Sequence, residues 1–279
     1  MTTDKIQFTK EKETMLITLS SRALQSQWKD PILRDPWAEE AMRHIDYDIS
    51  KQLSGVASWS MWKDIGCTIV ATRAATFDQL TNQYLADHPD ATVLHVGCGM
   101  DSRVFRLDPP ASLQWFDVDY PDVIDLRHQL FPERGTSSYH LIGAPLDDLR
   151  WLDQVPRDRP GLFIAEGVLH YLGETEVKAL LNAVVAHFPS GQMIFDICNT
   201  MIVKRTGSNV GGTGATYKWG LDDPQEIKQL EPKLELIKEF RPSEQVSFFR
   251  FPLWWRALYR VQELVPTLRR MERPIVYRF

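Results

Sequence analysis

Five short apolar runs, separated by segments long enough to form helices, constrain this chain more than any other feature of its sequence. The runs begin at residue 91 and read ATVLHV, LQWFDV, SYHLI, GLFIA and QMIFDI. Runs of this length are typical of strands buried on both faces, and helix-sized connections between them favour a parallel sheet with helices on both sides. One connection, GETEVKALLNAVVAHF, has the apolar spacing of an amphipathic helix. The sequence therefore predicts an α/β domain.

The residues before the first run predict a helical cap, residues 1–90, packed on that core. Asp35 is placed to act as an N-cap, with Pro36 at the first helical position. Apolar residues at helical spacing predict a further helix from Ile65 to Leu85.

Residues 91–279 are expected to form the core, and two parts of it interrupt the strand pattern. The first is an insertion at about 200–232, which contains the glycine-rich stretch RTGSNVGGTGATYK, a candidate loop over the substrate. The second is a helical segment at about 252–271, following Pro252. The runs LELIKEF and IVYRF predict two more strands.

Charge and cysteine content exclude several classes of protein. The 279 residues include 32 basic and 37 acidic side chains, a net charge of -5, which excludes a generally basic nucleic-acid-binding protein. No apolar stretch approaches the ~18 residues of a membrane span, and the charged start, MTTDKIQFTKEKET, is not expected to be a signal peptide. The three cysteines lie far apart, which predicts no metal site and favours a reducing compartment. We therefore expect a cytoplasmic protein without a metal or a membrane partner.

A glycine-containing turn follows the first apolar run. Gly97 and Gly99 allow the backbone to approach a ligand, although tight strand-to-helix turns also need glycine for structural reasons alone. Ser102 occupies the place of the third glycine of the dinucleotide fingerprint, which disfavours an oxidoreductase of that type. Asp119 ends the second run twenty positions after Gly99, where an acidic residue can accept both ribose hydroxyls. Together these residues predict a site for an adenosine-type ligand.

Four motifs in this order resemble the leucine carboxyl methyltransferase family. They are VLHVGCGMDSRVFRL, WFDVDYPDVIDLRHQL, LIGAPLDDL and FIAEGVLHYLGETEVKALL. The chain is most similar to the bacterial polyketide branch of that family, the tetracenomycin-type carboxyl O-methyltransferases, and the resemblance covers most of its length. It implies an S-adenosyl-L-methionine-dependent carboxyl O-methyltransferase of polyketide biosynthesis. It also implies a class I methyltransferase, Rossmann-like fold with a seven-stranded, mostly parallel sheet of order 3-2-1-4-5-7-6.

The resemblance also implies which residues bind the cofactor, S-adenosyl-L-methionine, and its product S-adenosyl-L-homocysteine. Arg73, in TRAATFD, matches the arginine that pairs with the methionine carboxylate, a contact suited to a guanidinium fork. Glu166 matches a glutamate beside the amino-acid end of the cofactor, where a carboxylate complements the ammonium and sulfonium. The full set of expected cofactor-binding residues is Arg73, Gly97, Gly99, Asp101, Asp119, Leu146, Asp147, Asp148 and Glu166.

One motif departs from the family pattern. Pro145 stands where the family usually has an acidic residue, and a proline side chain cannot accept a hydrogen bond from the adenine amino group. Backbone groups of Leu146, or the carboxylates of Asp147 and Asp148, are the alternatives for this contact.

The expected acceptor is a small carboxylic acid. A carboxylate is already ionised at neutral pH, so methyl transfer to it requires no general base. His170 and Tyr171 are candidate pocket residues, and a strand-end histidine satisfied by a hydrogen bond is an equally good interpretation of His170. The expected substrate-binding residues, which offer broad aromatic surfaces and a cation, are Tyr217, Lys218, Trp219 and Trp254. The alternatives are a phenolic O-methyltransferase, a protein C-terminal carboxyl methyltransferase, and a protein that binds the cofactor without transferring a methyl group.

Overall fold

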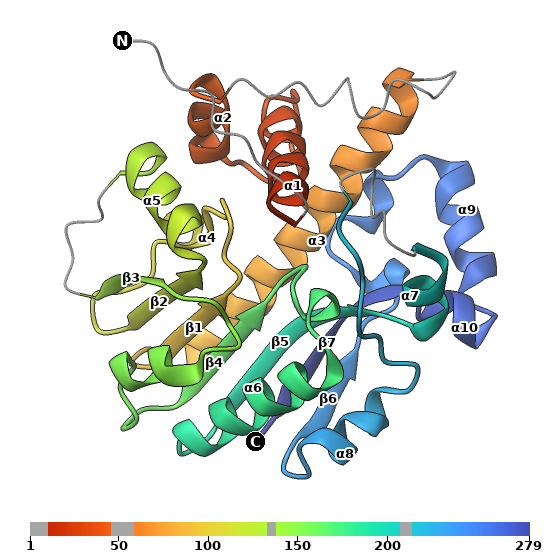
Figure 1. Ribbon diagram of the computed structural model, residues 1–279. Coiled ribbons are helices and arrows are strands. Elements are labelled where there is room, and N and C mark those ends of the chain that lie inside the picture. Colours follow the sequence, from red (N-terminus) through yellow and green to blue (C-terminus); the bar gives the residue numbers. More distant parts are fainter. Residues whose placement is uncertain (1–10, 46–58, 133–137, 207–213) are drawn as a thin grey trace.

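The computed structural model describes residues 11–45, 59–132, 138–206 and 214–279, which form a seven-stranded sheet with helices on both faces (Figure 1). The strands are β1 (Thr92–Val96), β2 (Gln114–Asp119), β3 (Tyr139–Gly143), β4 (Gly161–Ala165), β5 (Gly191–Cys198), β6 (Glu235–Glu239) and β7 (Glu272–Arg278). Their order is β3-β2-β1-β4-β5-β7-β6, which confirms the predicted order. β1 to β5 pair in parallel, whereas β7 runs antiparallel to both of its neighbours.

The helices alternate with these strands and also precede the first of them. They are α1 (Glu11–Ser26), α2 (Pro36–Arg43), α3 (Trp59–Asp87), α4 (Arg103–Leu107), α5 (Pro121–Leu130), α6 (Glu174–His187), α7 (Thr200–Thr206), α8 (Ile227–Leu230), α9 (Leu253–Gln262) and α10 (Pro266–Arg269). Short 3₁₀ helices are η2 (Leu149–Gln154), η3 (Leu169–Tyr171), η4 (Pro224–Glu226), η5 (Pro242–Glu244) and η6 (Phe248–Arg250).

The two faces of the sheet contribute to separate apolar clusters. Leu94 and Val96 of β1 pack with side chains of α6 and η2 on one face. Val93, one position out of phase, packs on the other face with side chains of α1, α2 and α3. Successive strand residues point to opposite faces, so a strand covered on both sides must be apolar at nearly every position. The predicted strands read as continuous apolar runs for this reason.

The second N-terminal helix begins where its capping residue predicts. The Asp35 Oδ1 atom accepts a hydrogen bond from the Ala38 amide at 3.0 Å, and Pro36 is the first residue of α2. The predicted third helix is present and is longer than expected, because α3 begins at Trp59. In Figure 1, α3 crosses from the carboxyl edge of the sheet to its rear face, with α1 beside it and α2 on the far side of α1.

Part of the predicted glycine-rich loop, residues 207–213, lies outside the described residues. Among the helices that the structure describes, none is both long and apolar enough to cross a membrane.

Candidate active site

The turn after β1 depends on two glycines. Gly97 and Gly99 have φ angles of 58° and 47°, a conformation that residues with a side chain rarely adopt. A Cβ atom at Gly97 would also lie 2.4 Å from the Val168 Cγ2 atom, so the space beside the turn is closed to any larger residue. The Gly99 amide donates to the Asp119 Oδ2 atom at 2.7 Å, which ties the turn to the end of β2.

A cavity of about 420 Å³ opens at this turn, at the carboxyl ends of the parallel strands. Ligands of open α/β sheets bind at this edge, where neighbouring connections diverge to opposite faces. The expected residues that line the cavity are Arg73, Gly97, Gly99, Asp101, Asp119, Leu146, Asp147, Glu166, His170, Tyr171, Tyr217 and Lys218. The structure therefore brings together residues that are up to 145 positions apart, between Arg73 and Lys218, around one space.

Three expected site residues lie away from the cavity. Asp148 caps η2 and pairs with the exposed Arg150 guanidinium, 2.6 Å from its Nη2 atom. Trp219 is 5% exposed and packs in the apolar cluster around β5, so its ring is buried in the core. Trp254 is 48% exposed on α9 and stacks edge-on against Trp255. The structure brings none of these three side chains to the cavity, and their roles in ligand binding stay predictions.

Arg73 is surrounded by carboxylates. Its guanidinium lies 2.9 Å from the Glu166 Oε1 atom, 3.2 Å from the Asp196 Oδ2 atom and 3.1 Å from the Glu272 Oε1 atom. Burial by itself would lower the pKa of Arg73, but these three carboxylates hold it well above its ordinary value. Negative charge therefore exceeds the local positive charge, which suits a ligand bearing cationic groups.

Asp119 combines burial with hydrogen bonds from the backbone. Its two oxygens accept from the Gly99 and Tyr120 amides, each at 2.7 Å. Burial raises the pKa of Asp119, and the two amides oppose that shift. Each carboxylate oxygen can accept more than one hydrogen bond, so the side chain keeps acceptor capacity for hydroxyl groups of a ligand.

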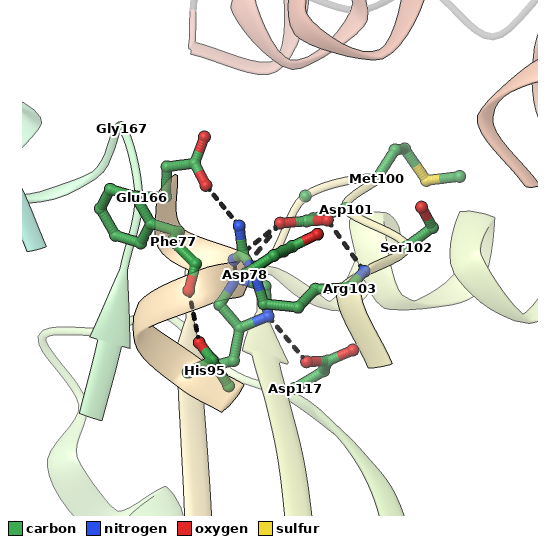
Figure 2. Close-up of polar contacts among 12 residues, drawn as sticks. Phe77, Asp78, His95, Met100, Asp101, Ser102, Arg103, Asp117, Glu166 and Gly167 are labelled. Carbon is green, nitrogen blue, oxygen red and sulfur yellow. Dashed lines mark hydrogen bonds and ion pairs between the residues drawn. The ribbon is translucent and has the colours of Figure 1, made fainter. Parts of the chain in front are cut away.

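A buried network of charges lies beneath the glycine turn, and sequence reasoning missed it. Arg103 is fully buried and contacts carboxylates from three parts of the chain, as Figure 2 shows. Arg106, one turn later on α4, pairs with Asp35, Asp78 and Asp101. The only sequence signal was the pair of arginines in DSRVFRL, which also fits an ordinary solvated helix face.

A second buried network supports the other side of the turn. Asp117, on β2, accepts from the His95 ring at 3.0 Å and from the Trp115 indole at 2.8 Å. It also pairs with Arg127, which donates to the Gly99 carbonyl at 2.8 Å. Burial raises the pKa of Asp117, but Arg127 and His95 shift it below its ordinary value, so this carboxylate stays ionised.

Part of the cavity lining is aromatic and consists of the rings of His170, Tyr171 and Tyr217. The His170 ring lies 4.6 Å from the Tyr171 ring and 4.1 Å from the Tyr217 ring, measured between centroids. The Lys218 amide donates to the His170 carbonyl at 2.7 Å, which holds the chain after the glycine-rich segment against η3. His170 is buried, its Nδ1 atom has no hydrogen-bond partner among the residues that the structure describes, and burial lowers its pKa to about 4. The imidazole is therefore neutral at neutral pH.

Comparison with known families matches residues 15–185 to the leucine carboxyl methyltransferases. The chain belongs to this family. TcmP, the tetracenomycin polyketide synthesis O-methyltransferase of Streptomyces glaucescens, is 41% identical to this chain over 239 residues. The match covers 85% of this chain and 85% of TcmP. The S-adenosyl-L-methionine-dependent methyltransferase dpfgK of Gibberella zeae is 34% identical over 250 residues, which cover 83% of this chain and 82% of that protein.

Solved structures confirm the methyltransferase fold of this family member. A crystal structure from Thermobifida fusca, described as that of a methyltransferase, superposes with a TM-score of 0.54 and 15% sequence identity. The match covers 92% of this chain and 93% of that one. The sequence family identifies the protein as a methyltransferase, and the strand order and this superposition show its fold.

Proposed function

We propose that this methyltransferase transfers a methyl group from S-adenosyl-L-methionine to a carboxylate of a small polyketide-like or aromatic molecule, forming a methyl ester. S-adenosyl-L-methionine supplies the methyl group already activated on a sulfonium, and the protein has to orient the donor and the acceptor and to exclude water. Two observations support the cofactor: the named relatives and the fit of the cavity residues to its chemical groups.

The cavity offers a suitable partner for each polar part of the cofactor. The Arg73 guanidinium suits the methionine carboxylate, and Glu166 suits the ammonium, because both are held ionised at the same end of the cavity. Asp119, at the far side of the glycine turn, suits the ribose hydroxyls. Leu146 and Asp147 line the cavity beside Pro145 and are proposed for the adenine.

The burial of His170, which makes its ring a weak base, is the observation that supports the choice of a carboxylate acceptor. An effective general base has a pKa near the working pH, whereas the pKa of His170 is lowered to about 4. Burial also raises the pKa of the neighbouring Tyr171 and Tyr217 hydroxyls, so neither is ionised at neutral pH. A phenol would have to lose its proton to one of these weak bases, whereas a carboxylate arrives ionised.

The aromatic wall suits a flat acceptor. The rings of His170, Tyr171 and Tyr217 lie in contact with one another, and the exposed Lys218 lines the same cavity. In the part of the chain that the structure describes, no ion pair is found for Lys218, whereas the other cavity-lining cations, Arg22 and Arg73, are paired with carboxylates. Lys218 is therefore proposed to attract the acceptor carboxylate, with the rings contacting its hydrocarbon part.

The test compares probes that differ only in the reacting group. The purified protein is incubated with S-adenosyl-L-methionine and either 2-naphthoic acid, 2-naphthol or a peptide with a free C-terminal carboxylate, and products are identified by mass spectrometry. We expect methyl 2-naphthoate, with a rate that is nearly flat between about pH 6 and 9 because the acceptor stays ionised.

The same assay distinguishes the alternatives. Replacing His170 by alanine should reduce the rate only modestly, because a carboxylate acceptor needs no general base. Loss of a true general base would instead cost roughly 10²–10⁴-fold in rate. A methyl ether of 2-naphthol as the main product, formed at a rate that rises with pH and collapses in His170→Ala, would make the protein a phenolic O-methyltransferase. Preferred methylation of the peptide would make it a protein methyltransferase, and bound cofactor with no methyl product from any probe would make it a cofactor-binding protein.

A further inference from the structure

Arg103 pairs with three carboxylates, two of which belong to residues assigned above to the cofactor. Its Nε atom donates to the Asp78 Oδ1 atom at 2.7 Å, its Nη1 atom lies 2.9 Å from the Asp101 Oδ2 atom, and its Nη2 atom donates to the Glu166 Oε2 atom at 2.6 Å. Figure 2 shows the guanidinium between these carboxylates, which come from α3, from the glycine turn and from the end of β4. The guanidinium also lies 5.5 Å from the centre of the Phe77 ring.

Arg103 is placed to act on the cofactor site without touching a ligand. Its side chain is 0% exposed and is not part of the cavity lining, whereas Asp101 and Glu166 are. The fork of the guanidinium fixes the direction in which both carboxylates point. A change at Arg103 would therefore reach a bound ligand only through these two side chains.

The two carboxylate oxygens of Glu166 accept hydrogen bonds from two different arginines. Arg73 donates to its Oε1 atom and Arg103 to its Oε2 atom, so neither oxygen is free to rotate away. Burial by itself would raise the pKa of Glu166, but the Arg73 and Arg103 guanidiniums hold it below its ordinary value. Without Arg103, this buried carboxylate would keep one guanidinium partner and would be free to turn toward Arg73 or to take up a proton.

We propose that Arg103 is a positioning residue for the amino-acid end of the cofactor, which orients the Glu166 carboxylate toward the ammonium and keeps it ionised. The inference rests on the proposed function, because it requires that Glu166 receives that ammonium. The proposed role distinguishes Arg103 from Arg106. Arg106 pairs with the same Asp78 and Asp101 but forms no ion pair with Glu166.

Two ligands distinguish positioning from a general structural role. S-adenosyl-L-homocysteine carries the amino-acid end, whereas 5′-methylthioadenosine keeps the adenosine and lacks that end. A residue that acts through Glu166 must affect the first ligand and spare the second. A residue that only supports the glycine turn must affect both, because both ligands place their adenosine against that turn.

The experiment is titration calorimetry of both ligands with the parent protein, Arg103→Lys and the matched control Arg106→Lys. Lysine keeps the charge but cannot hold three carboxylates with a planar fork, so Arg103→Lys should weaken S-adenosyl-L-homocysteine binding by about tenfold or more. Its affinity for 5′-methylthioadenosine should stay within roughly twofold of the parent, since one factor of ten is ~1.4 kcal/mol. Arg106→Lys should change the two affinities by the same factor.

A second variant keeps the test decisive if Arg103→Lys does not fold. Asp78→Asn removes the charge that holds the Nε atom of Arg103 and leaves Glu166 and Arg103 in the chain, so it should produce a smaller loss with the same selectivity. Combining Arg103→Lys with Glu166→Gln should cost little more S-adenosyl-L-homocysteine affinity than Glu166→Gln alone, because the two changes remove the same contact.

The outcomes separate this inference from the proposed function. Equal losses for both ligands in Arg103→Lys, or no loss for either, would overturn the positioning role while leaving the cofactor assignment intact. A parent protein that binds S-adenosyl-L-homocysteine no more tightly than 5′-methylthioadenosine would instead overturn the assignment of Arg73 and Glu166, and the inference with it.

Discussion

Replacing His170 by phenylalanine should make the stability of the protein less sensitive to acid. Phenylalanine can occupy the aromatic space between Tyr171 and Tyr217 and has no group that titrates. In the parent, the folded state holds the imidazole neutral because burial lowers its pKa from 6.5 to about 4. An unfolded chain exposes the same imidazole to water, where it takes up a proton near its ordinary pKa.

The sign and size of the effect follow from the two pKa values. Above pH 6.5 the imidazole is neutral in both states and contributes no pH dependence. Between 6.5 and about 4 the unfolded state binds a proton that the folded state rejects, so the free energy of unfolding falls as the pH falls. Each pH unit of that interval lowers the free energy of unfolding of the parent by about 1.4 kcal/mol. The parent therefore loses about 3 kcal/mol in total, and the variant does not.

Urea unfolding of parent and variant at several pH values between 7.5 and 4 measures this difference. Carboxylates held ionised by buried arginines also lose stability in acid, but they are common to both proteins and cancel when the two pH profiles are subtracted. As the pH falls, the free energy of unfolding of the parent should decrease relative to that of the variant, by more than ~1 kcal/mol after allowance for the uncertainty of the extrapolation. Parallel pH profiles would refute the burial of a neutral His170, and with it the argument against a histidine base.

Further substitutions test individual contacts. Arg73→Ala should weaken S-adenosyl-L-methionine binding at least ~10-fold by calorimetry, because charged hydrogen bonds contribute ~1.5–3 kcal/mol; an unchanged affinity in a folded variant would remove it from the site. Asp119→Ala should weaken 5′-methylthioadenosine and S-adenosyl-L-homocysteine to the same extent, since both carry the ribose, and selective loss of either would contradict the ribose assignment. Pro145→Asp should tighten both ligands if an adenine contact is missing; no change would mean that the existing backbone provides it. Lys218→Met should raise KM for a carboxylate acceptor with little change in kcat, whereas Lys204→Met on α7, outside the cavity, should leave both unchanged.

The sheet could be predicted from local sequence, but its full order could not. Each strand from β1 to β5 is a short apolar run because both of its faces are covered, and this property is visible in the sequence itself. The antiparallel insertion of β7 between β5 and β6 is different, because it depends on which edge the last segment reaches after the chain has folded. That part of the prediction came from the family resemblance.

Tryptophan shows why composition alone misplaces substrate residues. Trp219 and Trp254 were both expected to line the acceptor pocket because large rings suit aromatic ligands. Trp219 follows a segment that is anchored to the His170 carbonyl, and its ring is carried into the core beside β5. Trp254 lies on the outer side of α9. The same residue type therefore has two different surroundings, which only the path of the backbone determines.

The long helix α3 explains why the polar side of the site was the hardest part to predict. It carries Arg73 and Asp78 together with other polar residues such as Gln79, and neither position differs in sequence from a solvated helix residue. Asp78 becomes buried and Arg73 partly buried because α3 lies against the carboxyl edge of the sheet, where Glu166 follows β4 and the glycine turn ends in Asp101. Arg103 then connects Asp78 with these two carboxylates, although it is 25 positions from Asp78 and 63 from Glu166. A buried charge is tolerated only when such partners surround it. The charges of the site therefore depend on long-range packing, whereas the glycines of the turn and the aspartate at the end of β2 are set by local backbone needs and can be recognised in the sequence.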